Sequence, residues 1–250
     1  MLKHKTALLL DLDGVVLYQP HMMRHISHKS ARFVSEVLRV PLSDAQEINQ
    51  VLYTEFGHTL KGLQKVYGVR QTYADFASFV YDRATMDAMR TCADDAVMTT
   101  RSDQTARLAR LCLQQDIPMY LFSNAPSKWC FAALRLMHLL GPRAIPETNV
   151  LCSDHPVFTD RSSMKPNEQV YDNVEMHLQQ TLHDADVDMV FVDDTFGNLV
   201  PVISKSHWKP VLFKNGLMRT PCINTPKLHT VYNMTEVGSL LEEAINARTR

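Results

Sequence analysis

The sequence predicts an α/β protein with a doubly wound parallel sheet and an inserted helical cap. Two observations predict the sheet: short apolar runs recur along the chain, and segments with helical periodicity separate them. A third observation predicts the insertion, because residues 21–98 carry helical periodicity and no convincing strand. We therefore expect a core made of residues 1–16 and 95–250, and a helical cap made of residues 17–94.

The predicted strands are apolar runs that end at polar residues. Their alternation with helices implies right-handed crossovers and a Rossmann-like core. Asp103 is expected to cap the helix before the second strand. Lys165 and Pro166 are expected to open a later helix, since proline suits the first helical position. The strands are expected at residues 6–10, 118–122, 149–152, 189–192 and 210–213.

Polar side chains follow three of these strands at the points where the strands end. The carboxyl ends of parallel strands lie at one edge of a sheet, so these side chains are expected to meet there. Asp11 and Asp13 should also point the same way, because residues two apart on an extended chain share a face. Together with one lysine that is expected to open a helix, these residues form the candidate site: Asp11, Asp13, Ser123, Asn124, Lys165, Asp193 and Asp194.

Four acids in one crevice repel each other and require a cation. Mg²⁺ binds oxygen ligands and keeps water molecules that a phosphate can replace. One aspartate can then act as a nucleophile through an aspartyl-phosphate, while a second carboxylic acid protonates the leaving oxygen. A lysine and a hydroxyl can hold the phosphoryl oxygens. The pattern therefore predicts phosphoryl transfer with Mg²⁺ as the cofactor.

Four segments resemble, in the same order, the motifs of the haloacid dehalogenase superfamily of aspartyl-phosphate phosphatases. They are residues 11–15 (DLDGV), 121–125 (LFSNA), 165–166 (KP) and 191–195 (FVDDT). Together they extend over most of the chain, and their combination is specific. The resemblance implies the predicted α/β core with a cap that covers the site.

The resemblance also implies a role for each matched residue. Asp11 would be the nucleophile and Asp13 the general acid and base. Ser123 would bind the phosphoryl group with Asn124 beside it, and Lys165 would bridge the nucleophile and the phosphate.

The implied magnesium ligands come from three of the acids. Asp194 would bind the ion directly and Asp193 through water, while Asp11 and the backbone carbonyl of Asp13 would complete the set. The dehalogenase branch lacks the second aspartate of the first motif, so Asp13 argues for phosphate chemistry.

A narrower resemblance concerns residues 52–63 (LYTEFGHTLKGL), which look like the cap signature of pyrimidine 5'-nucleotidase-like phosphatases. It implies a nucleoside 5'-monophosphate as substrate, with His58, Thr59 and Lys61 as candidate cap contacts. Trp129 stands where that group commonly has histidine. Alternatives are a phosphatase or mutase acting on another small phosphate, such as a phosphosugar or pyridoxal phosphate, and a catalytically silent nucleotide-binding regulator.

Composition indicates the kind of partner and compartment. Lys and Arg number 26 against 27 Asp and Glu, and no basic run occurs, which argues against a nucleic-acid polymer as partner. No apolar run is long enough for a membrane span. Five cysteines without a Cys-x-x-Cys pair favour a reducing compartment. We expect a cytoplasmic protein that acts on a small phosphorylated metabolite. The sequence assigns neither an oligomeric state nor a role to residues 214–227.

Overall fold

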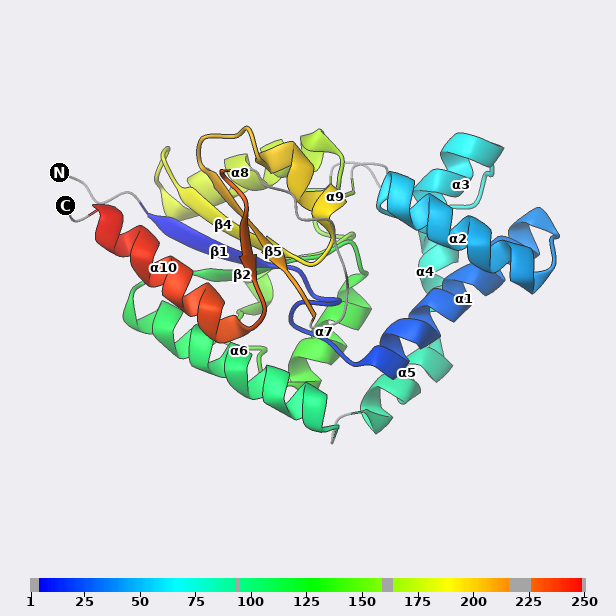
Figure 1. The fold of residues 1–250 in the computed structure, drawn as a ribbon, viewed down its shortest axis with the longest axis horizontal. Helices are drawn as coiled ribbons and strands as arrows, with labels where there is room; N and C mark the ends of the chain where they lie inside the picture. The colour runs from blue at the N-terminus through cyan, green and yellow to red at the C-terminus, as the bar shows by residue number, and fades with distance from the viewer. Residues whose placement is uncertain (1–4, 93–94, 159–163, 216–225, 249–250) are drawn as a thin grey trace.

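A six-stranded parallel sheet, in the order β3-β2-β1-β4-β5-β6, forms the centre of the molecule (Figure 1). The structure is a computed structural model and describes residues 5–92, 95–158, 164–215 and 226–248. The predicted doubly wound sheet is confirmed, and β6 is an additional strand that the sequence did not predict. The strands are β1 (Thr6–Leu10), β2 (Met119–Phe122), β3 (Val150–Leu151), β4 (Asp188–Asp193), β5 (Trp208–Phe213) and β6 (His229–Val231).

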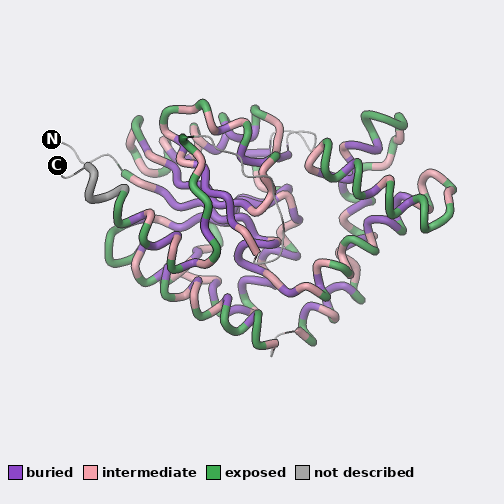
Figure 2. Tube along the Cα trace, viewed as in Figure 1, coloured by how far each residue is buried: buried purple, intermediate pink, exposed green. Residues whose placement is uncertain are grey.

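Helices cover both faces of the sheet, because its central strands are apolar on both sides. In β1, Leu8 and Leu10 pack into one core cluster, whereas Ala7 and Leu9 pack into the other. Buried residues accordingly run along the central strands (Figure 2). The helices are α6 (Ala96–Gln114), α7 (Ser127–Leu136) and α10 (Met234–Arg248) on one side, and α8 (Glu168–Leu182) and α9 (Phe196–Leu199) on the other, with short 3-10 helices at Glu147–Asn149 and Val200–Val202.

Five helices between β1 and α6 lie beside the carboxyl ends of the strands, and we call them the helical lobe (Figure 1). Aromatic side chains fill its interior; the rings of Phe33 and Phe76, for example, meet edge to face at 5.1 Å. No helix in the described ranges has the length and apolar character needed to cross a membrane. The lobe helices are α1 (Pro20–Leu38), α2 (Leu42–Phe56), α3 (Thr59–Tyr67), α4 (Tyr73–Val80) and α5 (Arg83–Thr91).

Two helices begin at residues other than those predicted. Asp95 caps α6 by accepting hydrogen bonds from the backbone N–H groups of Val97 and Met98, so Asp103 lies inside the helix. Asn167 caps α8 in the same way, so Pro166 precedes that helix. In both cases another Asp or Asn makes the capping hydrogen bonds.

Candidate active site

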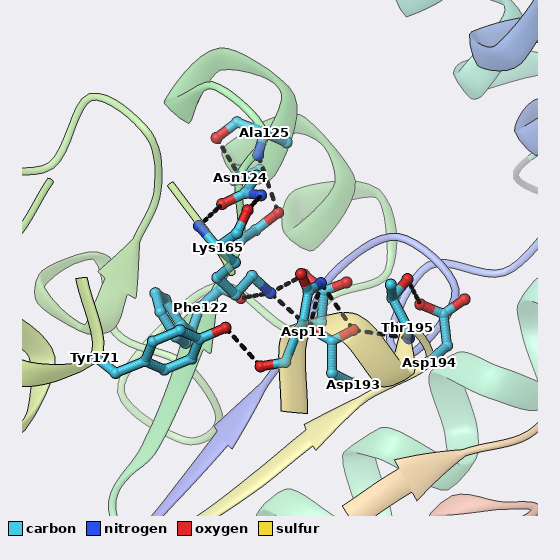
Figure 3. Close-up of polar contacts among 12 residues, drawn as sticks. Asp11, Phe122, Asn124, Ala125, Lys165, Tyr171, Asp193, Asp194 and Thr195 are labelled. Carbon is cyan, nitrogen blue, oxygen red and sulfur yellow. Dashed lines mark hydrogen bonds and ion pairs between the residues drawn. The ribbon is translucent and has the colours of Figure 1, made fainter. Parts of the chain in front are cut away.

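Neighbouring strands β1 and β4 bring three carboxylates to the carboxyl edge of the sheet (Figure 3). Leu10 lies opposite Val192, and the backbone N–H of Asp11 donates to the carbonyl of Val192 over 2.9 Å. Asp11, Asp193 and Asp194 each offer an oxygen atom, and these oxygens all lie within 4.8 Å of one another. The structure therefore brings together the acids that the sequence placed at one edge.

Lys165 connects two of these acids from beneath. Its side chain is 1% exposed. The Nζ atom donates to Oδ1 of Asp11 at 3.0 Å, to Oδ2 of Asp193 at 2.8 Å and to the carbonyl of Phe122 at 2.8 Å. The three donor hydrogens of the ammonium group are thus all used, and the lysine is fixed beside the predicted nucleophile.

The charges of the acids are only partly balanced by this lysine. Burial raises the pKa of Asp11 to about 7, against the opposing effect of Lys165. Burial, followed by the charges of Asp193 and Asp11, also raises the pKa of Asp194 well above its ordinary range. Burial lowers the pKa of Lys165, but the two acids outweigh burial and raise it overall. A second cation would relieve this repulsion, and an all-oxygen donor set fits Mg²⁺.

Both carboxylate oxygens of Asp193 already accept hydrogen bonds from other groups of the protein. The backbone N–H of Thr195 donates to Oδ1 at 2.8 Å, and the amide of Asn198 lies 3.1 Å from both carboxylate oxygens. Asn198 thus orients the loop after β4. Asp11 and Asp194 are left as the acids that can hold a cation directly.

Asp13 hydrogen-bonds to a residue that the sequence did not connect with it. The indole N–H of Trp129 donates to Oδ1 of Asp13 at 3.0 Å, and the Trp129 ring is fully buried, 5.2 Å from that of Tyr81. Burial raises the pKa of Asp13 to about 6, while Trp129 and Lys165 lower it. No sequence pattern links an indole with a carboxylate 116 residues away, so only the fold shows this pair.

The loop after β2 gives its two predicted residues different surroundings. The Ser123 hydroxyl accepts a hydrogen bond from the backbone N–H of Ala125 at 3.1 Å and retains its own proton to donate. The side-chain amide of Asn124 instead bonds to the backbone N–H and carbonyl of Lys165, both at 2.9 Å. The Asn124 side chain therefore anchors Lys165, and phosphate binding by Asn124 stays a prediction.

The turn after β1 needs glycine at position 14. Gly14 has a φ of +91°, and a Cβ atom there would collide with the Asp194 carboxylate. Gly14→Ala is therefore expected to displace Asp194, to destabilise the fold by about 1–3 kcal/mol, and to lower the affinity for Mg²⁺. Calorimetric Mg²⁺ titration and thermal unfolding measure these effects.

Gly68→Ala is the matched control for this variant. Gly68 also has a positive φ, of +65°, but a Cβ there would meet nothing within 4 Å. The Gly68→Ala variant should lose stability through backbone strain but keep its affinity for Mg²⁺. Equal Mg²⁺ affinities in the two variants would contradict the role of Gly14.

The predicted cap residues do not reach the acids as a group. His58 is buried, its Nδ1 accepts from the N–H of Leu60, and its ring packs 4.9 Å from that of Phe76. The Thr59 hydroxyl is also buried and donates to Asn49 at 2.7 Å. These two residues begin α3 and stabilise the lobe, rather than facing the acidic cluster. Lys61 is partly exposed and lines a cavity of about 290 Å³.

His58 should make the lobe sensitive to acid. Burial, followed by the charge of Lys61, lowers its pKa from 6.5 to about 4. Protonation then favours the unfolded chain, so stability is full above pH 6.5 and falls as the pH drops toward 4. His58→Asn keeps a capping side chain and removes this titration. When the pH is lowered from about 7.5 to 5.5, the free energy of unfolding of the wild type is expected to fall by about 1 kcal/mol more than that of the variant. Denaturant unfolding at the two pH values measures this difference. An equal loss of stability in the wild type and in His58→Asn would contradict the role of His58.

Two tyrosines of the helical lobe contact the site from above, and neither was predicted to do so. The Tyr73 hydroxyl donates to the carbonyl of Asn124 at 2.7 Å. The Tyr53 side chain lies beside Thr195 and Asp194, although 46% of the residue's surface is exposed. Burial and then the charge of Asp194 raise the pKa of Tyr53 above its ordinary value, so its hydroxyl stays protonated beside the acids.

Solved structures resemble this chain over nearly its whole length. A phosphoserine phosphohydrolase-like protein from Francisella tularensis subsp. tularensis SCHU S4 gives a TM-score of 0.57 at 15% identity, covering 94% of this chain and 99% of its own. A dehalogenase gives 0.54 at 18% identity, with 96% and 98% covered. The fold is that of the haloacid dehalogenase-like hydrolases.

A third structure with the haloacid dehalogenase-like fold was solved with bound magnesium. It is the HAD-hydrolase YfnB from Bacillus subtilis, with a TM-score of 0.52 at 17% identity, covering 96% of this chain and 99% of its own. No protein-family model and no curated protein matches the sequence. The comparisons thus establish the fold, and they do not confirm the narrower resemblance to pyrimidine 5'-nucleotidases.

Proposed function

We propose that this protein is a Mg²⁺-dependent phosphomonoester hydrolase that works through an aspartyl-phosphate. The observation that carries the proposal is the environment of Asp11. Lys165 holds one of its oxygens at 3.0 Å, and no described residue donates a hydrogen bond to the other, Oδ2. A buried carboxylate with one oxygen fixed and one available is suited to in-line attack on phosphorus.

In the first step, an oxygen of Asp11 attacks the phosphorus atom while the bond to the leaving oxygen breaks. Asp13 donates its proton to that oxygen, so the alcohol departs neutral. In the second step, Asp13 takes a proton from water, and the resulting hydroxide cleaves the aspartyl-phosphate and releases inorganic phosphate. The Ser123 hydroxyl holds a phosphoryl oxygen, and Lys165 holds another by exchanging one of its three hydrogen bonds for it. A pKa of about 6 for Asp13 suits a group that must give and regain a proton near neutral pH.

Asp11, Asp194 and the backbone carbonyl of Asp13 would hold the magnesium ion, and Asp193 would contribute through water. When bound, the ion neutralises charge on the phosphoryl oxygens and on the acids around them. The side chains of Asp11 and Asp194 each accept a single described hydrogen bond, whereas Asp193 accepts four, and this difference supports the division of roles.

Asp13 favours phosphate over halide chemistry. Departure of an alcohol from a phosphate ester requires a proton donor, whereas a halide ion leaves without one. The carboxyl of Asp13 is held by Trp129 at 3.0 Å, beside the acids whose pKa values it raises. We therefore propose a phosphatase rather than a dehalogenase.

We propose a nucleoside 5'-monophosphate as the first substrate class to test, with residues 17–94 as a cap that selects the leaving group. Residues 52–63, which resemble the nucleotidase cap signature, support this choice. Tyr53, which is 46% exposed, also offers an aromatic ring and a hydroxyl beside the site. Lys61 remains a predicted substrate contact, and no polymer or membrane partner is proposed.

The test uses purified full-length protein with Mg²⁺, first on p-nitrophenyl phosphate and then on a panel of phosphorylated metabolites. We expect turnover that EDTA abolishes and added Mg²⁺ restores, with UMP and CMP among the best substrates. Interconversion of hexose phosphates would indicate a mutase instead. Nucleotide binding without turnover of any phosphate would indicate a regulator, and activity that survives EDTA would contradict the proposed mechanism.

A further inference from the structure

A buried arginine holds the turn after β1. The side chain of Arg101, on α6, is 9% exposed. One guanidinium nitrogen donates to the carbonyl of Val15 at 2.5 Å, and another donates to Oδ1 of Asn215 at 2.9 Å. The amide nitrogen of Asn215 in turn donates to the carbonyl of Gly14 at 2.6 Å. Two consecutive carbonyls of the turn are thus fixed by one connected pair of side chains.

Aromatic rings fix the guanidinium group as well. It lies 4.5 Å from the centre of the Phe213 ring and 5.6 Å from that of Tyr18, which are favourable cation–π distances. Burial lowers the pKa of Arg101 to about 10, while Tyr18 and Asp194 raise it. The group therefore remains charged at neutral pH, and the charge of Asp194 acts on it.

A buried charge without a carboxylate partner is costly, and none of the described carboxylates forms an ion pair with Arg101. A neutral amide could also donate to a carbonyl of the turn, so hydrogen bonding alone does not explain the charge. The acids of the site do, because the charge of Asp194 acts on the buried guanidinium and raises its pKa.

We propose that Arg101 is a positioning residue, which holds the turn at Gly14 and Val15 against Asp194 and thereby fixes Asp13 and Asp194 for the reaction. This inference rests on the proposed function, since it assigns Arg101 to the same site. Arg101 touches neither substrate nor metal; it acts through the turn. Because Gly14 has no side chain, the turn is in direct contact with Asp194, and a small movement of the turn reaches the acids.

Three variants test the proposal. Arg101→Met removes the charge and both hydrogen bonds while keeping a long side chain. Arg101→Lys keeps the charge but cannot reproduce the two-pronged contact. Asn215→Ala leaves the arginine in place and removes the bond to Gly14. Arg107→Met is the matched control, because Arg107 is exposed on the same helix.

Each variant is assayed with p-nitrophenyl phosphate at saturating Mg²⁺, titrated calorimetrically with Mg²⁺ alone, and checked by thermal unfolding. For Arg101→Met we expect kcat to fall by about 10- to 100-fold with little change in KM, since misplaced groups slow chemistry more than binding. The affinity for Mg²⁺ should also fall several-fold. Arg101→Lys should recover part of the lost kcat and part of the lost Mg²⁺ affinity. Asn215→Ala should give values of kcat and Mg²⁺ affinity between those of Arg101→Met and the wild type. Arg107→Met should match the wild type.

Wild-type kcat and Mg²⁺ affinity in a folded Arg101→Met protein would overturn the proposal. If that variant does not fold, Asn215→Ala decides: wild-type values would overturn the proposal, and a lower kcat with weaker Mg²⁺ binding would uphold it. If the wild type hydrolyses no phosphate, the proposed function fails separately, and the Mg²⁺ titrations still decide whether Arg101 positions the acids.

Discussion

Asp11→Asn is expected to lower hydrolysis of p-nitrophenyl phosphate by at least about 10³-fold, because an amide oxygen is a poor nucleophile for phosphorus. Asparagine has nearly the same shape, and its oxygen can still accept the hydrogen bond that Lys165 donates at 3.0 Å. The loss should therefore appear in kcat, with the fold intact. Steady-state kinetics and circular dichroism together measure this result.

A second measurement detects the intermediate itself. Wild-type protein quenched in acid during turnover should gain the mass of one phosphoryl group, and the Asp11→Asn protein should not. Asp103→Asn is the matched control, since Asp103 is exposed in the middle of α6, away from the site. Full activity in Asp11→Asn, or a phosphoryl group on another residue, would refute Asp11 as the nucleophile.

Lys165→Met is expected to lower both stability and activity more than any other substitution of a single lysine. It leaves Asp11 and Asp193, which are buried, without the cation that now lies within 3.0 Å of both. Breaking a buried ion pair on one side costs about 3–5 kcal/mol, which for a chain of this size lowers the melting temperature by roughly 10 °C. Hydrolysis should become undetectable, because we propose that the residue also holds a phosphoryl oxygen.

The stability of Lys165→Met can be compared with and without Mg²⁺, and with that of a surface lysine variant. Added Mg²⁺ should restore part of the lost stability, because the ion takes over some of the charge compensation. Lys205→Met is the control: Lys205 pairs with Asp172 on the surface, and such pairs contribute about 0–1 kcal/mol. Equal melting temperatures for the two variants in EDTA would show that Lys165 does not compensate the acids.

The sequence predicted the fold wherever apolar runs were long enough to identify a buried strand. β1, β2, β4 and β5 follow from such runs. β6 (His229–Val231) does not, because it has three residues, two of them exposed, and depends on its pairing with β5. The start of α6 was misplaced since Asp103 and Asp95 are both good capping residues, and local sequence does not choose between them.

The site was predictable for residues whose position follows from strand ends, and not for residues that depend on packing. Asp11, Asp193 and Asp194 meet because parallel strands end at one edge. The partners of Asp13 and of the Gly14 turn lie on α7 and α6, and the faces that these helices present depend on the whole core. Most of the segment 214–227 lies outside the described residues; Asn215, near its start, proved to contact the turn.

The order of the strands has a consequence for the durability of the site. β1 and β4 are paired on both sides, whereas β3 and β6, at the edges, have two and three residues. Local opening begins where few contacts hold the backbone, so the edges should exchange their amide hydrogens long before the centre. Asp11, Asp193 and Asp194 are attached to the two slowest strands. Thermal motion that loosens the rim of the sheet therefore leaves the geometry of the acids intact.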